Sequence, residues 1–211
     1  MGLGSLAEAF SRLCAVNGGT YILNRDIDEI KYDENGNFSG IISQGEEING
    51  KILISEPSYV QKFGIVKSVG RVLRRICILD HPIPKTNNFN SCQIVLTGGE
   101  IKKGNDIFIA LFNSTYCVCP KGYYLAIIST IVETENYINE IKPAMDIIGD
   151  VLEVFDEVSD IYYPIDTSFK GNIYITSSYD HECHFENDIN NVIEIYEKIT
   201  GTKLNLLLNE N

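Results

Sequence analysis

Four runs of β-branched and aromatic residues, separated by turn-forming segments, occupy the middle of the sequence and constrain its fold most strongly. Runs of this length and composition are typical of β-strands. The segments between them contain prolines and paired glycines that mark turns, as in His81-Pro82-Ile83-Pro84 and Gly98-Gly99. The pattern therefore predicts strands at 72–79, 93–97, 106–112 and 123–132.

A smaller antiparallel sheet is predicted nearer the start of the sequence. Short alternating runs lie at 27–32, 38–42 and 51–55, and the turn signal Asn35-Gly36 separates the first two. We expect these three runs to pair with one another in a single sheet.

Three helices and one further strand complete the pattern. The first helix is predicted at 5–17 and ends at Asn17-Gly18-Gly19, because glycine readily adopts the left-handed conformation that closes helices. A short strand at 173–176 precedes the last helix, near 186–200. A helix after Pro143 is predicted from apolar residues on one face, namely Met145, Ile148, Val151, Leu152 and Phe155. Strands mixed with helices predict an α/β or α+β fold, and 211 residues suffice for one large domain or two small ones.

The charge of the chain limits its partners. Lysine and arginine total 17 against 29 for aspartate and glutamate, which gives a net charge of -12. Such a field repels phosphate backbones and anionic lipid surfaces, so we expect no nucleic-acid binding and no polybasic membrane anchor. The sequence also has no signal-peptide pattern and no apolar run long enough to span a bilayer. These features predict a cytoplasmic protein whose six cysteines are buried free thiols.

The sequence offers few candidates for catalysis, cofactor binding or metal binding. Gly2-Leu3-Gly4-Ser5-Leu6-Ala7 matches a degenerate dinucleotide fingerprint, but the preceding strand that delivers such a glycine turn is missing from the sequence given. His181-Glu182-Cys183-His184 lacks the ligand spacing of a zinc site. Cys117-Val118-Cys119 would point its thiols to opposite sides of a strand. Common hydrolase motifs are absent as well. We therefore expect no catalytic residue, no cofactor and no metal.

Several longer phrases resemble the Rab GDP dissociation inhibitor family, which belongs with the Rab escort proteins in one superfamily. They occur in family order over essentially the whole sequence. The phrases are GLGSLAEAFSRLCAVNGGTYILN at 2–24, SEPSYV at 55–60, RICILDHPIPKTNNFNSCQIVL at 75–96, IISTIVET at 127–134, and SDIYYPID followed by SSYD and HFE.

The resemblance implies an α/β fold with an α+β insertion, similar to the FAD/NAD(P)-binding fold of flavoprotein monooxygenases but without the cofactor. It matches the C-terminal half of the family pattern, so the N-terminal half is expected to be missing from this chain. On this reading, residues 1–63 form the second part of a nucleotide-binding-type lobe. Residues 64–160 form a mainly antiparallel insertion like a substrate domain, and residues 161–211 return to the first lobe with a C-terminal helix.

The function implied by the resemblance is regulation rather than catalysis. The family binds prenylated Rab GTPases in the GDP form, slows GDP release, and supports recycling of the GTPases from membranes during vesicle traffic. Membrane contact would then be indirect, through the prenylated Rab, and the full-length protein would be a monomer. Two alternatives stay open: a fragment of a flavin- or nicotinamide-dependent oxidoreductase, because the fold is shared, and a Rab escort protein.

The resemblance also implies a Rab-binding surface on the first helix and on a strand that follows it. Arg12 matches the platform arginine, and Thr20 and Ile22 match strand positions, where Ile22 replaces a family methionine. Ser5 stands where the family usually has glutamate. An arginine on an exposed helix face can form a bidentate pair with a carboxylate of the GTPase.

Overall fold

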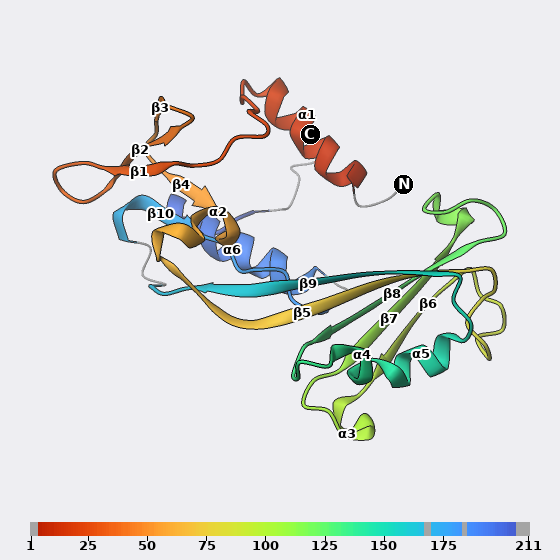
Figure 1. Ribbon diagram of the computed structural model, residues 1–211. Coiled ribbons are helices and arrows are strands. Elements are labelled where there is room, and N and C mark those ends of the chain that lie inside the picture. Colours follow the sequence, from red (N-terminus) through yellow and green to blue (C-terminus); the bar gives the residue numbers. More distant parts are fainter. Residues whose placement is uncertain (1–3, 167–169, 183–184, 206–211) are drawn as a thin grey trace. The chain divides into compact units, whose positions relative to one another are not determined.

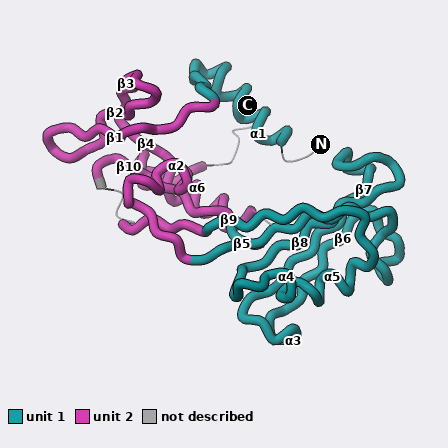
Figure 2. Tube along the Cα trace, in the orientation of Figure 1, with its two compact units in different colours: residues 1–23, 70–160, 180–183 teal, residues 24–69, 161–179, 184–211 magenta. Residues whose placement is uncertain are grey.

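The computed structural model describes residues 4–166, 170–182 and 185–205, and its elements are labelled in Figure 1. The chain divides into two compact units, coloured in Figure 2. Unit 1 contains Met1–Leu23, Gly70–Asp160 and Asp180–Cys183, and unit 2 contains Asn24–Val69, Ile161–Tyr179 and His184–Asn211. No helix in the described part of the chain is both long enough and apolar enough to cross a bilayer.

Unit 1 is built on a five-stranded sheet with the order β6-β7-β8-β5-β9. The pairs β6–β7, β7–β8 and β5–β8 are antiparallel. The four runs that the sequence predicts as strands are therefore confirmed, and β5 begins earlier than expected. The strands are β5 (Val66–Leu79), β6 (Ser91–Leu96), β7 (Ile107–Asn113), β8 (Tyr124–Ile131) and β9 (Glu153–Pro164).

One face of this sheet is covered by two short helices, α4 (Tyr137–Glu140) and α5 (Lys142–Ile148), as Figure 1 shows. The central strands direct Ile109 and Ile128, which are register partners, into the core. Ile141, which lies between the two helices, and Ala144 and Ile148 of α5 add fully buried side chains to the same cluster. Burial at this layer stabilises the unit by about 25 cal/mol per Å² of apolar surface. Another short helix, α3 (Gly98–Ile101), lies between β6 and β7 in the chain.

The predicted helix after Pro143 is only partly correct. It ends at Ile148, because Gly149 has a φ of 84° and breaks the helical conformation. Residues 153–164 form β9 instead, and Leu152 and Phe155 are exposed. The Asp156 carboxylate in β9 accepts hydrogen bonds from Nε and Nη2 of Arg75 in β5, both at 2.6 Å. This bidentate pair joins the two strands within unit 1.

Unit 2 contains two small sheets. β1 (Glu29–Tyr32), β2 (Phe38–Ser43) and β3 (Glu46–Asn49) form an antiparallel sheet in that order. The predicted run at 51–55 does not join this sheet. It supplies β4 (Leu53–Ser55), which pairs in parallel with β10 (Ile173–Ile175). The third antiparallel strand is β3, which the tight turn at Gln44 and Gly45, both with positive φ, folds back on β2.

The remaining elements of unit 2 are short helical turns and one long helix. They are α2 (Pro57–Val60), the 3-10 turns η1 (Gln61–Phe63) and η3 (Lys170–Asn172), and α6 (Glu186–Thr200). The unit's core joins the small sheet to α2 and β10 through Ile30, Phe38, Val60 and Ile175. The predictions of a strand near 173–176 and a helix near 186–200 are confirmed.

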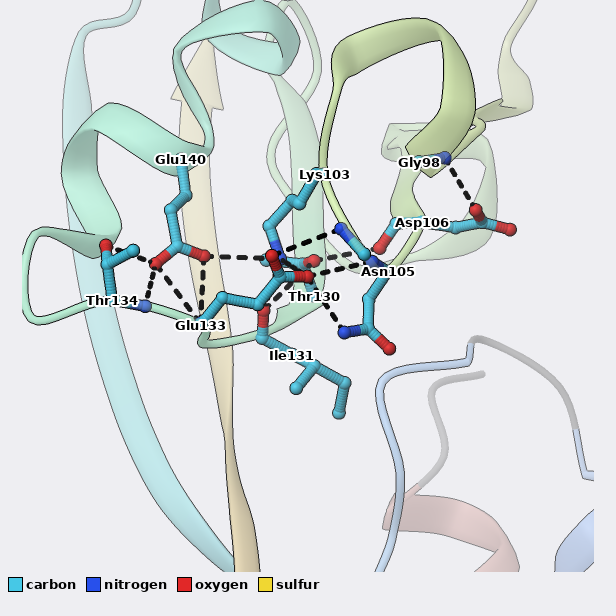
Figure 3. Close-up of polar contacts among 10 residues, drawn as sticks. Gly98, Lys103, Asn105, Asp106, Thr130, Ile131, Glu133, Thr134 and Glu140 are labelled. Carbon is cyan, nitrogen blue, oxygen red and sulfur yellow. Dashed lines mark hydrogen bonds and ion pairs between the residues drawn. The ribbon is translucent and has the colours of Figure 1, made fainter.

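A polar cluster closes one end of the core of unit 1, and Figure 3 shows its contacts. Lys103 donates from Nζ to the Ile131 carbonyl at 2.5 Å and to Glu133 Oε1 at 3.0 Å. The same ammonium lies 3.2 Å from Glu140 Oε2 in α4. The side chains of Lys103 and Glu140 are only 6% and 9% exposed, so these charges depend on one another.

Backbone and side-chain donors also form hydrogen bonds to the carboxylates of Glu133 and Glu140. Glu133 accepts hydrogen bonds from the backbone of Gly104 and from the backbone and side chain of Asn105. Glu140 accepts from the backbone of Glu133 and from Thr134. The cluster thereby ties the loop before β7 and the loop after β8 to α4. Burial raises the pKa of Glu133, but the hydrogen bonds from Asn105, Gly104 and Lys103 outweigh burial and lower the pKa to about 2.

Removal of the lysine charge should destabilise unit 1. In Lys103→Met, two partly buried carboxylates lose their shared cation, so we expect the free energy of unfolding to fall by about 3 kcal/mol. Urea denaturation at pH 7 measures this change. Lys102→Met is the matched control, because Lys102 is exposed and we expect its replacement to change stability by less than about 0.5 kcal/mol. Equal stability of the two variants would contradict a stabilising role for the cluster.

Acid should weaken the same cluster. The Glu133 carboxyl has a pKa lowered from 4.5 to about 2 in the folded chain, so the unfolded chain takes up the proton first as the pH falls. We therefore expect stability to decrease from about pH 4.5 down to about pH 2. Denaturation measured across this range should show a smaller decrease for Glu133→Gln than for wild type. Glu135→Gln, whose side chain is 94% exposed in wild type, should keep the wild-type slope, and identical slopes for all three chains would refute the prediction.

Candidate functional site

The first helix, α1 (Gly4–Val16), is confirmed at the predicted position, and all its residues except the half-buried Ser11 are exposed. Its apolar residues recur at helical spacing, yet none of the helix residues is buried. Leu6, Phe10 and Leu13 are 51%, 62% and 56% exposed. Apolar surface of this extent on a single helix is typical of an interaction surface rather than of solvent-facing structure.

The helix ends at the glycine pair that the sequence indicates. The backbone N–H groups of Asn17 and Gly19 both donate to the Cys14 carbonyl, at 3.1 and 2.9 Å, and Gly18 has a φ of 85°. A side chain at Gly19 would approach the Cys14 carbonyl oxygen to 3.1 Å. Glycines at these two positions therefore allow the chain to turn sharply away from the helix axis and present Thr20 beside its end.

Two of the four predicted site residues, Ser5 and Arg12, lie on α1. They are seven residues apart, which is close to two helical turns, so they share one face of the helix. Both are exposed. Among the described residues, no carboxylate lies within ion-pair distance of Arg12, and Glu8 one turn earlier does not pair with it. The guanidinium is therefore available to a carboxylate of a partner.

The other two predicted residues, Thr20 and Ile22, lie just beyond the helix and are also exposed. The strand expected here is wrong, because residues 19–28 form neither strand nor helix in the structure. No strand of the described chain pairs with this segment. Without a neighbouring strand, the β-branched side chains of the segment cannot by themselves produce a sheet.

Two apolar residues beside these positions were missed from the sequence. Tyr21 and Leu23 flank Ile22. Tyr21 and Ile22 are each 53% exposed, and Leu23 is 80% exposed. The signal was present, because four residues of the sequence read Thr-Tyr-Ile-Leu between polar segments. The resemblance pointed only to Thr20 and Ile22, so the two apolar neighbours were not considered.

The structure gives no support to the candidates for a cofactor or metal site. Gly4 starts α1, and a side chain there would meet nothing within 4 Å, so no close approach requires glycine; Gly2 and Leu3 lie outside the described residues. The described residues contain no cluster of histidine, cysteine or acidic side chains able to hold a metal. Cys183 and His184 lie outside them.

The cysteines differ in part from the expectation of buried thiols. Cys77 is buried, whereas Cys14 and Cys117 are exposed, and the five described cysteines are all free. Cys117 and Cys119 do not lie in a strand, so the argument from strand geometry does not apply to them. Cys117 has a φ of 60° and closes the 3-10 turn η2 (Ser114–Tyr116) in the loop between β7 and β8.

Sequence comparison links the whole chain to one family. The family described as GDI, GDP dissociation inhibitor, matches residues 1–211. The chain is 47% identical to a probable secretory pathway GDP dissociation inhibitor 1 of Schizosaccharomyces pombe, over 96% of this chain and 46% of the relative. It is 40% identical to Rab GDP dissociation inhibitor beta of Rattus norvegicus, over 96% of this chain and 45% of the relative. The chain thus spans about half the length of these curated relatives.

Solved structures agree with this relationship. A Rab GDI from Plasmodium falciparum superimposes with a TM-score of 0.91 at 40% identity, over 97% of this chain and 46% of that one. A flavin-dependent halogenase from Brevundimonas superimposes over 95% of this chain and 41% of that one, with a TM-score of 0.58 at 11% identity, which shows the fold alone. The predicted mixed α/β fold with likeness to flavoproteins is thereby confirmed. The chain belongs to the GDP dissociation inhibitor family.

Proposed function

We propose that this chain acts as the corresponding part of a Rab GDP dissociation inhibitor, a regulator rather than an enzyme. In this role it binds prenylated Rab GTPases in the GDP form in the cytoplasm, slows GDP release and supports recycling of the GTPases in vesicle traffic. The relatives bear the names of inhibitors, and their identity to this chain extends over nearly all of it. The binding partner and the nucleotide state are the parts of this proposal that require experiment.

The observation that carries the proposal is the exposed surface at the start of the chain. We define the platform as the exposed residues Ser5, Arg12, Thr20 and Ile22 with the adjoining Tyr21 and Leu23. It combines a guanidinium that has no ion-pair partner among the described residues with apolar side chains, a composition that is enriched at the energetic centres of protein interfaces. Such a platform suits a GTPase surface that offers a carboxylate surrounded by apolar residues.

The proposed domain organisation follows from the same family relationship. We propose that residues 1–63 and 161–211 belong to a nucleotide-binding-type lobe and that residues 64–160 form the insertion between them. The five-stranded sheet of unit 1, which is drawn largely from 70–160, supports this division. We also propose that the protein uses no flavin, since Gly4 lacks the close contact that a nucleotide-binding glycine makes. The family resemblance further suggests a monomer at full length.

Replacement of Arg12 should weaken GTPase binding selectively. A charge-assisted pair at a partly buried interface contributes roughly 1 to 3 kcal/mol, so Arg12→Ala should weaken binding of a GDP-loaded Rab by about 5-fold to 150-fold. Calorimetric titration with GDP-loaded Rab, and with the same Rab carrying a GTP analogue, measures both affinity and nucleotide preference. We expect wild type to prefer the GDP form.

Arg71→Ala is the control for that titration. Arg71 lies in unit 1, and it pairs with Glu135 at 3.1 Å in an exposed ion pair. Its replacement removes the same charge outside the platform, so we expect wild-type affinity. An equal loss in the two arginine variants would indicate a general charge effect, and no loss in Arg12→Ala would remove Arg12 from the platform.

Restoration of the family's usual acid should strengthen binding. Ser5 lies in the first turn of α1 on the face that carries Arg12, and a carboxylate near a helix N-terminus is also favoured by the helix dipole. We expect Ser5→Glu to increase affinity for GDP-loaded Rab about fivefold, the effect of roughly 1 kcal/mol. Ser11→Glu adds the same charge on another side of the helix and should not increase affinity. A gain in neither variant would show that position 5 does not face the GTPase.

A further inference from the structure

We propose that two loops at one end of the unit 1 sheet form a docking surface for the anionic face of a lipid bilayer. The loops are residues 80–90, between β5 and β6, and residues 114–123, between β7 and β8. We call them together the lipid tip. This inference goes beyond GTPase binding, and it adds a direct membrane contact to the indirect contact that the resemblance implies through the prenylated Rab.

Each loop is bonded to the strand end that adjoins the other loop. The hydroxyl of Tyr116 in the second loop lies 2.7 Å from that of Ser91, which begins β6 directly after the first loop. Asn113, which ends β7 directly before the second loop, donates from its side-chain amide to Asn90 in the first loop at 2.7 Å. The ring of Tyr116 also meets Phe112 of β7 edge-on at 5.8 Å between centroids. The neighbouring residues of both loops therefore belong to one surface.

Contacts within each loop fix its shape. In the first loop, Ile83 is buried in the core, and its carbonyl accepts a hydrogen bond from the Thr86 hydroxyl at 2.7 Å. In the second, Asn113 caps η2 by accepting from the Thr115 backbone at 2.9 Å, and Cys119 donates from Sγ to the Tyr123 carbonyl at 3.1 Å. Apolar side chains on such ordered loops are exposed because of the fold, and they need no rearrangement to reach a membrane.

The exposed side chains of the lipid tip have the character that bilayer interfaces favour. Phe89 is 59% exposed, and the other large side chains exposed there are Tyr116, Val118 and Tyr123. Tyrosine is enriched at the level of the lipid headgroups, because its ring is apolar while its hydroxyl remains hydrated. The tip therefore offers side chains for both the apolar and the polar part of the interface.

Charge favours a lipid surface at the tip even though the whole chain repels one. Residues 81–99 and 107–132 contain none of the 29 acidic residues, and each segment contains one lysine, Lys85 or Lys121. Both lysines are exposed. The acid in the tip itself is Asp80, at the start of its first loop, and Asp150 lies near it, because His81 Nε2 is 2.9 Å from the Asp150 carbonyl. At physiological ionic strength, charges more than about 8 Å from the membrane are largely screened, so the tip's own lysines determine the local attraction.

Sedimentation with vesicles tests the charge component without any GTPase, so its result is independent of the proposed function. The 211-residue chain should bind vesicles of phosphatidylcholine with 30% phosphatidylserine more tightly than vesicles of phosphatidylcholine alone. Each lysine near an anionic surface contributes about fivefold to partitioning, so Lys85→Gln with Lys121→Gln should reduce it about 25-fold. The control pair Lys51→Gln with Lys67→Gln, at exposed positions outside the tip, should retain wild-type partitioning.

Tryptophan fluorescence tests insertion, because the chain contains no tryptophan. Phe89→Trp should show a blue shift with the anionic vesicles and quenching by brominated lipid. Tyr59→Trp, at a 57% exposed position in unit 2, should show neither. Absence of vesicle binding, equal loss in the two lysine pairs, or an unquenched Trp at position 89 would overturn the proposal, and the tip would then be a surface for a protein partner.

Discussion

The structure of unit 1 depends on burial between the central strands and the two short helices that cover one face of its sheet. Alternate residues of β7 and β8 point into this layer, and Ile141, Ala144 and Ile148 close it from the helix side. The layer ends at Lys103, whose charge must be compensated because its side chain is almost fully buried. Apolar burial thus sets the position of the helices, and the ion cluster sets where the loops at that end must lie.

The candidate binding surfaces differ from the core, because their apolar side chains are exposed. None of the platform residues is buried, and the lipid tip exposes Phe89, Tyr116, Val118 and Tyr123. Both surfaces combine exposed apolar groups with basic side chains that have no acid within ion-pair distance in the described chain. These are Arg12 on the platform, and Lys85 and Lys121 on the lipid tip. A GTPase carrying a lipid chain and the membrane that holds it would engage these two surfaces separately.

Local sequence signals predicted much of the fold. They failed where the structure of a segment depends on pairing with residues far away in the sequence. The runs at 106–112 and 123–132 were predicted correctly because alternation and β-branching persist over a whole strand. The helix was extended past Ile148 because Val151, Leu152 and Phe155 continue the helical spacing, whereas Gly149 and the pairing of Asp156 with Arg75 decide for β9. The parallel pairing of β4 with β10 joins segments more than one hundred residues apart, which no local pattern reveals.

The site was predicted to a smaller extent than the fold. Helical spacing placed Ser5 and Arg12 together on α1, but their role came from family resemblance, because an exposed arginine on a helix is by itself unremarkable. The central claim is that this platform holds a Rab in its GDP form. The most direct test is release of a fluorescent GDP analogue from a Rab at increasing concentrations of the chain. The account predicts saturable slowing of release that Arg12→Ala weakens and Arg71→Ala does not. An unchanged release rate at saturating wild-type chain would contradict it.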